Sequence, residues 1–169
     1  MGDKKRSINV FEAERGFSLA ELVVVTIIIG FLAAIAIPRF ANAVSRHRAD
    51  VTANRIIRDL ELAQQRAKIT SSSQTVRFNI MLNRYRLIDV VGVDSSRTAY
   101  VVTLSEQPYR AKIISFSLGG DTDIIFDGRG MPDSEGTITI EVGGKQKTIK
   151  VDPDTGRASL EELSVDGNQ

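Results

Sequence analysis

The sequence contains no cysteine, no tryptophan and a single histidine. Without cysteine the chain cannot form a disulfide, a thiolate metal site or a cysteine nucleophile, and its redox compartment is left open. Seven phenylalanines and three tyrosines among 169 residues also leave few aromatic side chains for stacking on nucleic-acid bases. The histidine, His47, lies in a helical repeat, and no serine stands in a nucleophile motif. The sequence therefore indicates no catalytic residue, metal or cofactor.

Charge is balanced over the whole chain but is unevenly distributed. There are 22 Lys and Arg against 21 Asp and Glu. Residues 39–70 hold seven basic and three acidic side chains, a net of +4, and residues 131–169 hold four and eight, a net of −4. An acidic C-terminal part disfavours nucleic-acid binding there. The basic face between Arg39 and Arg66 is open to two interpretations, contact with anionic lipid headgroups or a solvated helix face.

Residues 17–37 form an apolar run of 21 residues with one charge, Glu21. As a helix this run is about 30 Å long, which matches the apolar core of a bilayer. The rest of the chain is too small to enclose it as a core helix, so the run predicts a membrane helix. Four basic residues precede it and four follow within twenty residues, so charge counting does not give its orientation.

Glu21 is the unusual residue of this segment, because a carboxylate within a membrane helix costs roughly 2.5–3.5 kcal/mol. One interpretation places it near enough to the interface to reach headgroups. The other interpretation is that a partner cation lies at the same depth in the membrane and neutralises Glu21. Cleavage before Phe17 would free an α-amino group four residues before Glu21. Within one helix this amine and the Glu21 carboxylate would be i,i+4 neighbours. The same amine could instead neutralise Glu21 of an adjacent subunit.

The stretch from Arg15 to Leu22, RGFSLAEL, closely resembles the class III signal of type IV prepilins and type II secretion pseudopilins. The resemblance implies that a prepilin peptidase cuts after Gly16 and N-methylates Phe17, and that Glu21 guides assembly. It implies an inner-membrane protein whose leader, residues 1–16, lies in the cytoplasm and whose globular part lies in the periplasm. The match extends to about residue 40 and includes Gly30 and Pro38.

A second processing signal competes with this one. Ala34-Ile35-Ala36 resembles the A-x-A site of an ordinary secretory signal peptide, cleaved near residue 36. Glu21 would interrupt the apolar region of such a signal, and the polar leader would be long. This alternative predicts a mature chain without a membrane helix.

Beyond the membrane run the pattern predicts an amphipathic helix over residues 38–73, with a kink at Pro38. Phe40, Val44, His47 and Val51 form a first apolar stripe. A second stripe consists of Ala53, Ile56, Ile57, Leu60, Ala63 and Ala67. The charged residues, Asp59 included, are expected largely on the opposite side. Thr70 to Ser73 should end the helix.

From residue 74 the period changes to two, which predicts strands. Gly143-Gly144 suits a two-residue hairpin turn. The expected fold class is α+β, a long helix packed on an antiparallel sheet over residues 74–169. The strands are expected at residues 74–80, 85–90, 98–104, 112–118, 123–126, 137–142 and 145–151.

This second half resembles the GspH/FimT-like branch of the pseudopilin family. The resemblance rests on the segment from Leu60 to Phe78, on FDGRG at residues 126–130 and on TGR at residues 155–157. It implies a minor pseudopilin near the tip of a type II secretion pseudopilus, or alternatively a minor type IV pilin of pilus biogenesis or DNA uptake. Expected partners are the prepilin peptidase, other pseudopilins or pilins, and the secretin or secreted cargo.

DNA-binding members of this branch carry Gly-Arg-x-Arg near the C-terminus. Here the match is Gly156-Arg157-Ala158-Ser159, so only Arg157 is present and DNA binding is disfavoured. Acidic residues at 121, 123, 127, 133 and 135 could offer oxygen ligands to calcium, but their spacing does not fit an EF-hand. A solvated turn between strands is the preferred interpretation.

Overall fold

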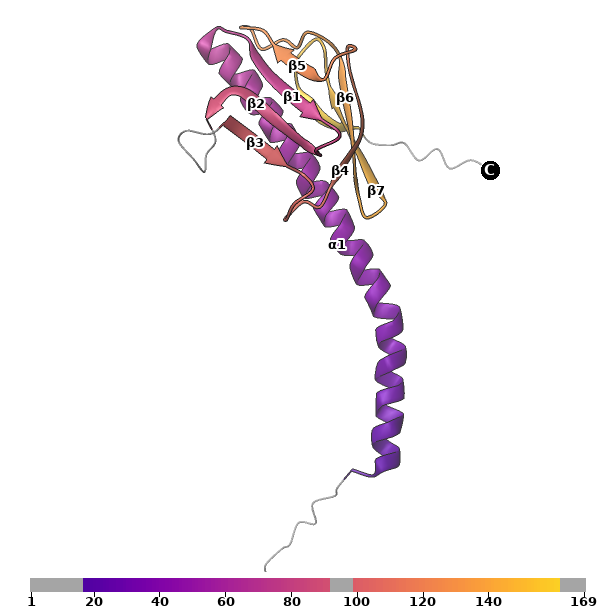
Figure 1. Ribbon diagram of the computed structural model, residues 1–169. Coiled ribbons are helices and arrows are strands. Elements are labelled where there is room, and N and C mark those ends of the chain that lie inside the picture. Colours follow the sequence, from indigo (N-terminus) through magenta and orange to yellow (C-terminus); the bar gives the residue numbers. More distant parts are fainter. Residues whose placement is uncertain (1–16, 92–98, 162–169) are drawn as a thin grey trace, which may run out of the picture. The chain divides into compact units, whose positions relative to one another are not determined.

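A computed structural model describes residues 17–91 and 99–161 (Figure 1). The chain divides into two compact units between Arg39 and Phe40. The first contains the apolar run, and the second contains the remainder of the helix and all of the strands. The α+β class predicted from the sequence is confirmed.

The helix α1 extends over Leu19–Thr70, 52 residues. Its first backbone bond runs from Leu22 N to Ser18 O, 3.1 Å. Glu21 in the first turn and Lys68 in the last turn both have the sign that the helix dipole favours. The helix ends where Ser71 adopts a φ of 50°, as the run of small polar residues predicts.

The strands form two four-stranded antiparallel sheets rather than the single sheet expected. The first has the order β3-β2-β1-β5 and the second has the order β4-β6-β7-β8. The last strand, β8, was not predicted, because it is only four residues long and half polar. The strands are β1 (Gln74–Asn79), β2 (Arg84–Val91), β3 (Ala99–Thr103), β4 (Lys112–Leu118), β5 (Asp123–Phe126), β6 (Gly136–Val142), β7 (Lys145–Val151) and β8 (Ala158–Glu161).

The hairpin between β6 and β7 has the turn that its sequence predicts. Gly143 and Gly144 have φ angles of 56° and 76°, and Val142 pairs with Lys145 across them. Positive φ at both central residues is the requirement of a type I′ turn, which matches the twist of the flanking strands. In this sheet Ile138, Ile140 and Ile149 are fully buried.

Both sheets and the second part of α1 share one apolar core. The second predicted stripe of the helix is confirmed, with Ile57 only half-buried. The prediction of the first apolar stripe was wrong, because Phe40 is 73% exposed and His47 is also exposed. Among the described residues, the buried face of the helix begins at Ala49.

The two glycine motifs that carry the family resemblance meet at one buried helical side chain, Gln64. Its Nε2 atom donates to Gly130 O at 2.9 Å and to Thr155 O at 2.8 Å. Gly156 has a φ of 68°, and a Cβ there would collide with Gln64 and with Gly130 O. The FDGRG and TGR stretches are therefore loops that close on the helix.

We expect Gly156→Ala to lower the free energy of unfolding by about 2–4 kcal/mol, because it adds both left-handed backbone strain and a steric collision. Gly144→Ala is the matched control. Its φ is also positive, at 76°, but a Cβ there meets nothing within 4 Å. It should therefore cost only the backbone strain, about 1 kcal/mol. Chemical denaturation of both variants in detergent micelles checks this, and equal losses would contradict the loop closure.

Candidate functional site

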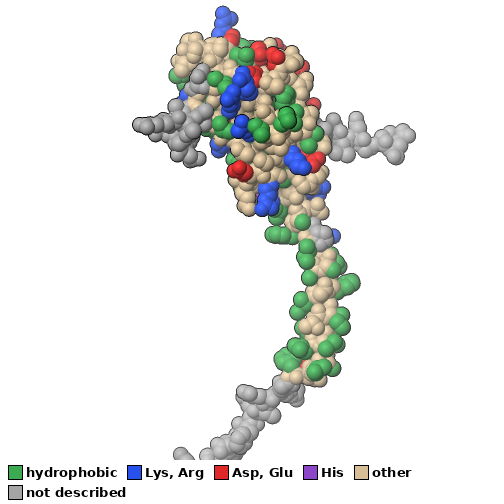
Figure 2. Space-filling view, in the orientation of Figure 1, with side chains coloured by type: hydrophobic (Ala, Val, Ile, Leu, Met, Phe, Trp, Pro, Cys, Tyr) green, Lys and Arg blue, Asp and Glu red, His purple; other side chains and the backbone are tan. Residues whose placement is uncertain are grey.

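The first candidate site is the start of the apolar helix. Phe17 is 79% exposed, Glu21 is exposed, and no residue in the most apolar 18-residue window of the helix is buried. The window has a mean hydropathy of 2.7, so by length and composition the helix could span a membrane. Figure 2 shows hydrophobic side chains on both edges of this part of the chain. Gly16 lies outside the described residues.

Phe17 lies two residues before the helix, which begins at Leu19. Cleavage before Phe17 and the pairing of the resulting amine with Glu21 remain predictions. Residue 38 lies within α1, so the helix continues past Pro38 as predicted. The kink at that position remains a prediction.

The second site is a buried carboxylate on the other part of the helix, Asp59, which is 5% exposed. Tyr85 Oη donates to its Oδ2 atom at 2.6 Å and Tyr100 Oη donates to its Oδ1 atom at 2.7 Å. Arg55 Nε, one turn earlier, also donates to Oδ2 at 3.0 Å. The expectation that Asp59 faces solvent was wrong. The helical period does not indicate that Asp59 is buried, because the two tyrosines that bind it lie on β2 and β3, 26 and 41 residues further along the chain.

The surroundings of this carboxylate shift the acidity of both tyrosines. Burial, followed by the nearby charge of Asp59, raises the pKa of Tyr85 well above its usual value. Burial and the hydrogen bond to Asp59 raise the pKa of Tyr100 to about 12. Each phenol donates its proton to a carboxylate that has little access to water, so ionising the phenol would put two negative charges together. The arrangement holds the first sheet on the helix.

The acidic residues considered for calcium are mostly engaged within the protein. In the ranges 17–91 and 99–161, no group of three or more His, Asp or Glu side chains lies where it could hold a metal ion. Backbone hydrogen bonds, the one from Met131 first, lower the pKa of Asp127. The contacts are Asp123 with Arg77, Asp127 with the amides of Arg129 and Met131, Asp133 with the amide of Ile125, and Glu135 with Lys150.

Arg157 lies at the end of the turn between β7 and β8, and its side chain is exposed. Its carbonyl accepts a hydrogen bond from Asp152 N at 2.9 Å. In the same turn Asp152 accepts bonds from Thr155, which lower the pKa of the Asp152 carboxyl. DNA binding through Arg157 remains an untested and disfavoured prediction.

A helix apolar and long enough to cross a membrane, continuing into a unit of antiparallel sheets, defines a pilin-like subunit. The chain belongs to the family of the type II transport protein GspH, whose model matches residues 52–155. The family and the fold together make the protein a minor pseudopilin or pilin, a structural class rather than an enzyme class. Such subunits assemble with other pilin-like subunits.

Two solved structures share the fold. The chain is similar to the minor pseudopilin EpsH of the Vibrio cholerae type II secretion system, with a TM-score of 0.52 and 17% identity over 68% of this chain and 96% of that chain. It is also similar to the type IV minor pilin FimU of Pseudomonas aeruginosa, with a TM-score of 0.51 and 15% identity over 69% of this chain and 90% of that chain. No curated protein sequence matches the chain.

We predict that the folded domain loses stability above pH 10. Below pH 10 both phenols keep their protons in the folded and the unfolded chain, so their contribution is complete. Above it the unfolded chain releases protons that Tyr85 and Tyr100 retain, and the contribution is lost as the pH rises towards 12. For Tyr100 the loss should be about 1 kcal/mol, allowing for solvent screening, and Tyr85 should add to it in the same direction.

Denaturant titrations of the full chain between pH 8 and pH 12 measure this slope. Tyr100→Phe should flatten it. Tyr109→Phe, which removes a half-buried phenol that does not bond to Asp59, should leave most of it in place. An unchanged slope in Tyr100→Phe would rule out this origin of the pH dependence.

Proposed function

We propose that this chain is a minor pseudopilin of a type II protein secretion system and that it lies near the tip of the periplasmic pseudopilus. The observation that carries the proposal is the match of residues 52–155 to the type II transport protein GspH. EpsH of Vibrio cholerae, which has the same fold, is a minor pseudopilin of such a system. The neighbours of this chain would be other pseudopilins, and its outer surface would face the secretin or secreted cargo.

In this proposal residues 17–37 anchor the precursor in the inner membrane, with residues 1–16 in the cytoplasm and the sheets in the periplasm. A prepilin peptidase cuts after Gly16 and methylates the new amine of Phe17. The segment 17–37 is then transferred from lipid into a fibre core. Its apolar side chains, exposed in the isolated subunit, would become covered by those of neighbouring subunits.

Glu21 supplies the specificity of this transfer. It is the only charged residue among residues 17–38, so its carboxylate has no cation of its own segment to pair with. A methylated Phe17 amine on the next subunit would remove the cost of the unpaired charge, roughly 2.5–3.5 kcal/mol. The same amine could instead pair with Glu21 of its own helix, four residues away.

A second candidate function is that of a minor type IV pilin. The likeness to FimU, with a TM-score of 0.51, is as strong as the likeness to EpsH, with 0.52. The two functions differ in their phenotype. If the chain is a pseudopilin, we expect its deletion to impair protein secretion and to leave surface pili in place, and if it is a minor pilin we expect the reverse.

We expect the mature protein, isolated from membranes of the native host, to begin at N-methylated Phe17. The expectation follows from the resemblance of residues 15–22 to a class III signal. Mass spectrometry of the N-terminal peptide measures it. A chain that begins near Ile37 would point to ordinary signal-peptide cleavage after Ala36, and the fibre mechanism would have to be abandoned.

We expect Glu21→Ala to leave cleavage after Gly16 intact but to reduce incorporation into the fibre by about tenfold or more, because a charge-assisted contact is lost. Quantitative immunoblotting of sheared fibres against membranes measures the ratio. Thr26→Ala is the control, since Thr26 is polar and lies in the same segment but bonds only to Val23 O of its own helix, at 2.8 Å. Normal incorporation of Glu21→Ala would disprove the pairing.

A further inference from the structure

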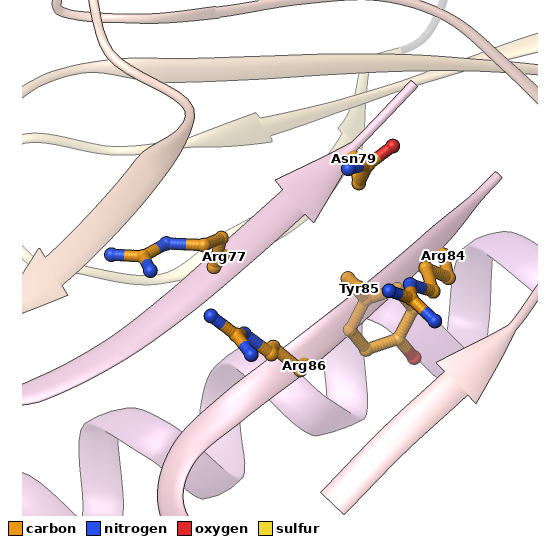
Figure 3. A pocket seen from close by; sticks show the side chains of 5 residues that line it. All are labelled: Arg77, Asn79, Arg84, Tyr85 and Arg86. Atoms are coloured by element: carbon orange, nitrogen blue, oxygen red, sulfur yellow. The ribbon is translucent and has the colours of Figure 1, made fainter. Parts of the chain in front are cut away.

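The outer face of β1 and β2 carries a cluster of arginines. Strand alternation turns Val76, Phe78, Tyr85 and Leu87 into the core and leaves the residues between them exposed. In Figure 3, Arg77 and Asn79 on β1 lie across from Arg84 and Arg86 on β2. Together with Tyr85 they line a hollow of about 140 Å³. We call these four exposed residues, Arg77, Asn79, Arg84 and Arg86, the arginine face.

The register of the two strands brings like charges together on this face. Arg77 and Arg86 are direct Cα partners in the antiparallel pair, an arrangement that destabilises a sheet unless an anion is near. Asp123 on β5 provides one carboxylate, and both of its oxygens bond to Arg77, the shortest contact being 2.6 Å. Arg84 and Arg86 form no ion pair within residues 17–91 and 99–161. The arginine face therefore holds three guanidinium groups, and one carboxylate, that of Asp123, lies beside it.

Exposed apolar side chains border the arginine face. The turn that joins β1 to β2 presents Ile80, Met81 and Leu82 to solvent, and Met81 is 92% exposed. On the other side, Val101 of β3 lies directly opposite Arg86 in the sheet and is also exposed. Figure 2 shows Lys and Arg side chains among hydrophobic ones in the region where Figure 1 draws β1 and β2. Arginine and methionine beside apolar side chains are the composition that protein interfaces favour.

We infer that the arginine face is a docking site for an extended acidic segment of a partner protein, held by carboxylates on Arg84 and Arg86 and by an apolar side chain beside Met81 or Val101. Arg84 and Arg86 stand two residues apart on one strand, about 7 Å. Carboxylates at alternate positions of an extended segment have the same spacing. A guanidinium binds a carboxylate through two parallel hydrogen bonds, which fixes the direction of the partner as well as its affinity.

Three features of the face and its border favour a polypeptide over a nucleic acid. Asp123 lies beside Arg77 and would repel a continuous phosphate backbone. The hollow of about 140 Å³ accommodates a group the size of one side chain, comparable to a cavity that holds a benzene molecule. The exposed apolar border would also gain nothing from phosphates. The inference goes beyond the proposed function, because it concerns the folded sheets and applies equally to a pseudopilin and a pilin.

The test uses the full chain in uncharged detergent micelles and a fluorescein-labelled nine-residue peptide in which glutamate alternates with threonine around a central leucine. Fluorescence anisotropy should show saturable binding that weakens as salt is added. The double variant Arg84→Gln/Arg86→Gln should bind this peptide about tenfold or more weakly, because each lost pair leaves a carboxylate unmatched. The same peptide with glutamine for glutamate should not bind.

Arg66→Gln is the matched control, since Arg66 is exposed and its side chain forms no ion pair in the described part of the chain. It should leave binding unchanged. The melting temperature of the double variant should equal or exceed that of the wild type, because the variant relieves like-charge repulsion. A marked drop in the melting temperature would show that the two arginines stabilise the fold, and it would overturn the inference.

Three other outcomes would also overturn it. The first is the absence of saturable binding by the glutamate peptide, or equal binding by the double variant. The second is tighter binding of a thymidine dodecamer than of the peptide, which would identify the occupant as a nucleic acid. The third is self-association of the wild type that the double variant abolishes, which would identify it as a second copy of the chain.

Discussion

The fold depends on polar side chains that the helix α1 buries beneath the strands. Asp59 enters the core as a carboxylate and is satisfied by Tyr85, Tyr100 and Arg55. Five residues later, the side-chain amide of Gln64 donates to carbonyls of two loops. A buried polar group without a partner costs more than its hydrogen bond contributes, so these contacts permit few alternative arrangements. Burial of the apolar stripe drives the packing of α1 on the strands. Asp59 and Gln64 select one register of the helix against the strands.

Small residues occupy much of the buried face of the helix. Ala49, Ala53, Ala63 and Ala67 are each fully buried or nearly so. Larger residues, Ile56 and Leu60, fill the middle of the face, where both are also buried. The strands β1 and β2 of the first sheet are buried on one face, and their other face is exposed and carries the arginines. The strand β2 thus contributes Tyr85 to the core and contributes Arg84 and Arg86 to a separate, exposed surface.

The sequence predicts best those features that depend on neighbouring residues. The apolar run around Glu21, the Gly143-Gly144 turn and the end of the helix at Thr70 all follow from local patterns. The division into two sheets does not, because β1 pairs with β5, 46 residues away at Arg77 and Asp123, and β4 joins a different sheet. Asp59 was misplaced for the same reason, since a charged residue is assigned to solvent unless its distant partners are known. The arginine face required the register of β1 and β2, which brings Arg77 opposite Arg86.

The way α1 is fastened to the strands has a mechanical consequence. The helix is attached along a length of about 27 Å between Ala49 and Ala67, through an apolar face and through the bonds of Asp59 and Gln64. A force along the helix axis would load these contacts simultaneously, in shear, rather than break them one after another. Tension carried by the helix would therefore be distributed over both sheets, and the domain would be expected to move as an intact body when its anchor is pulled.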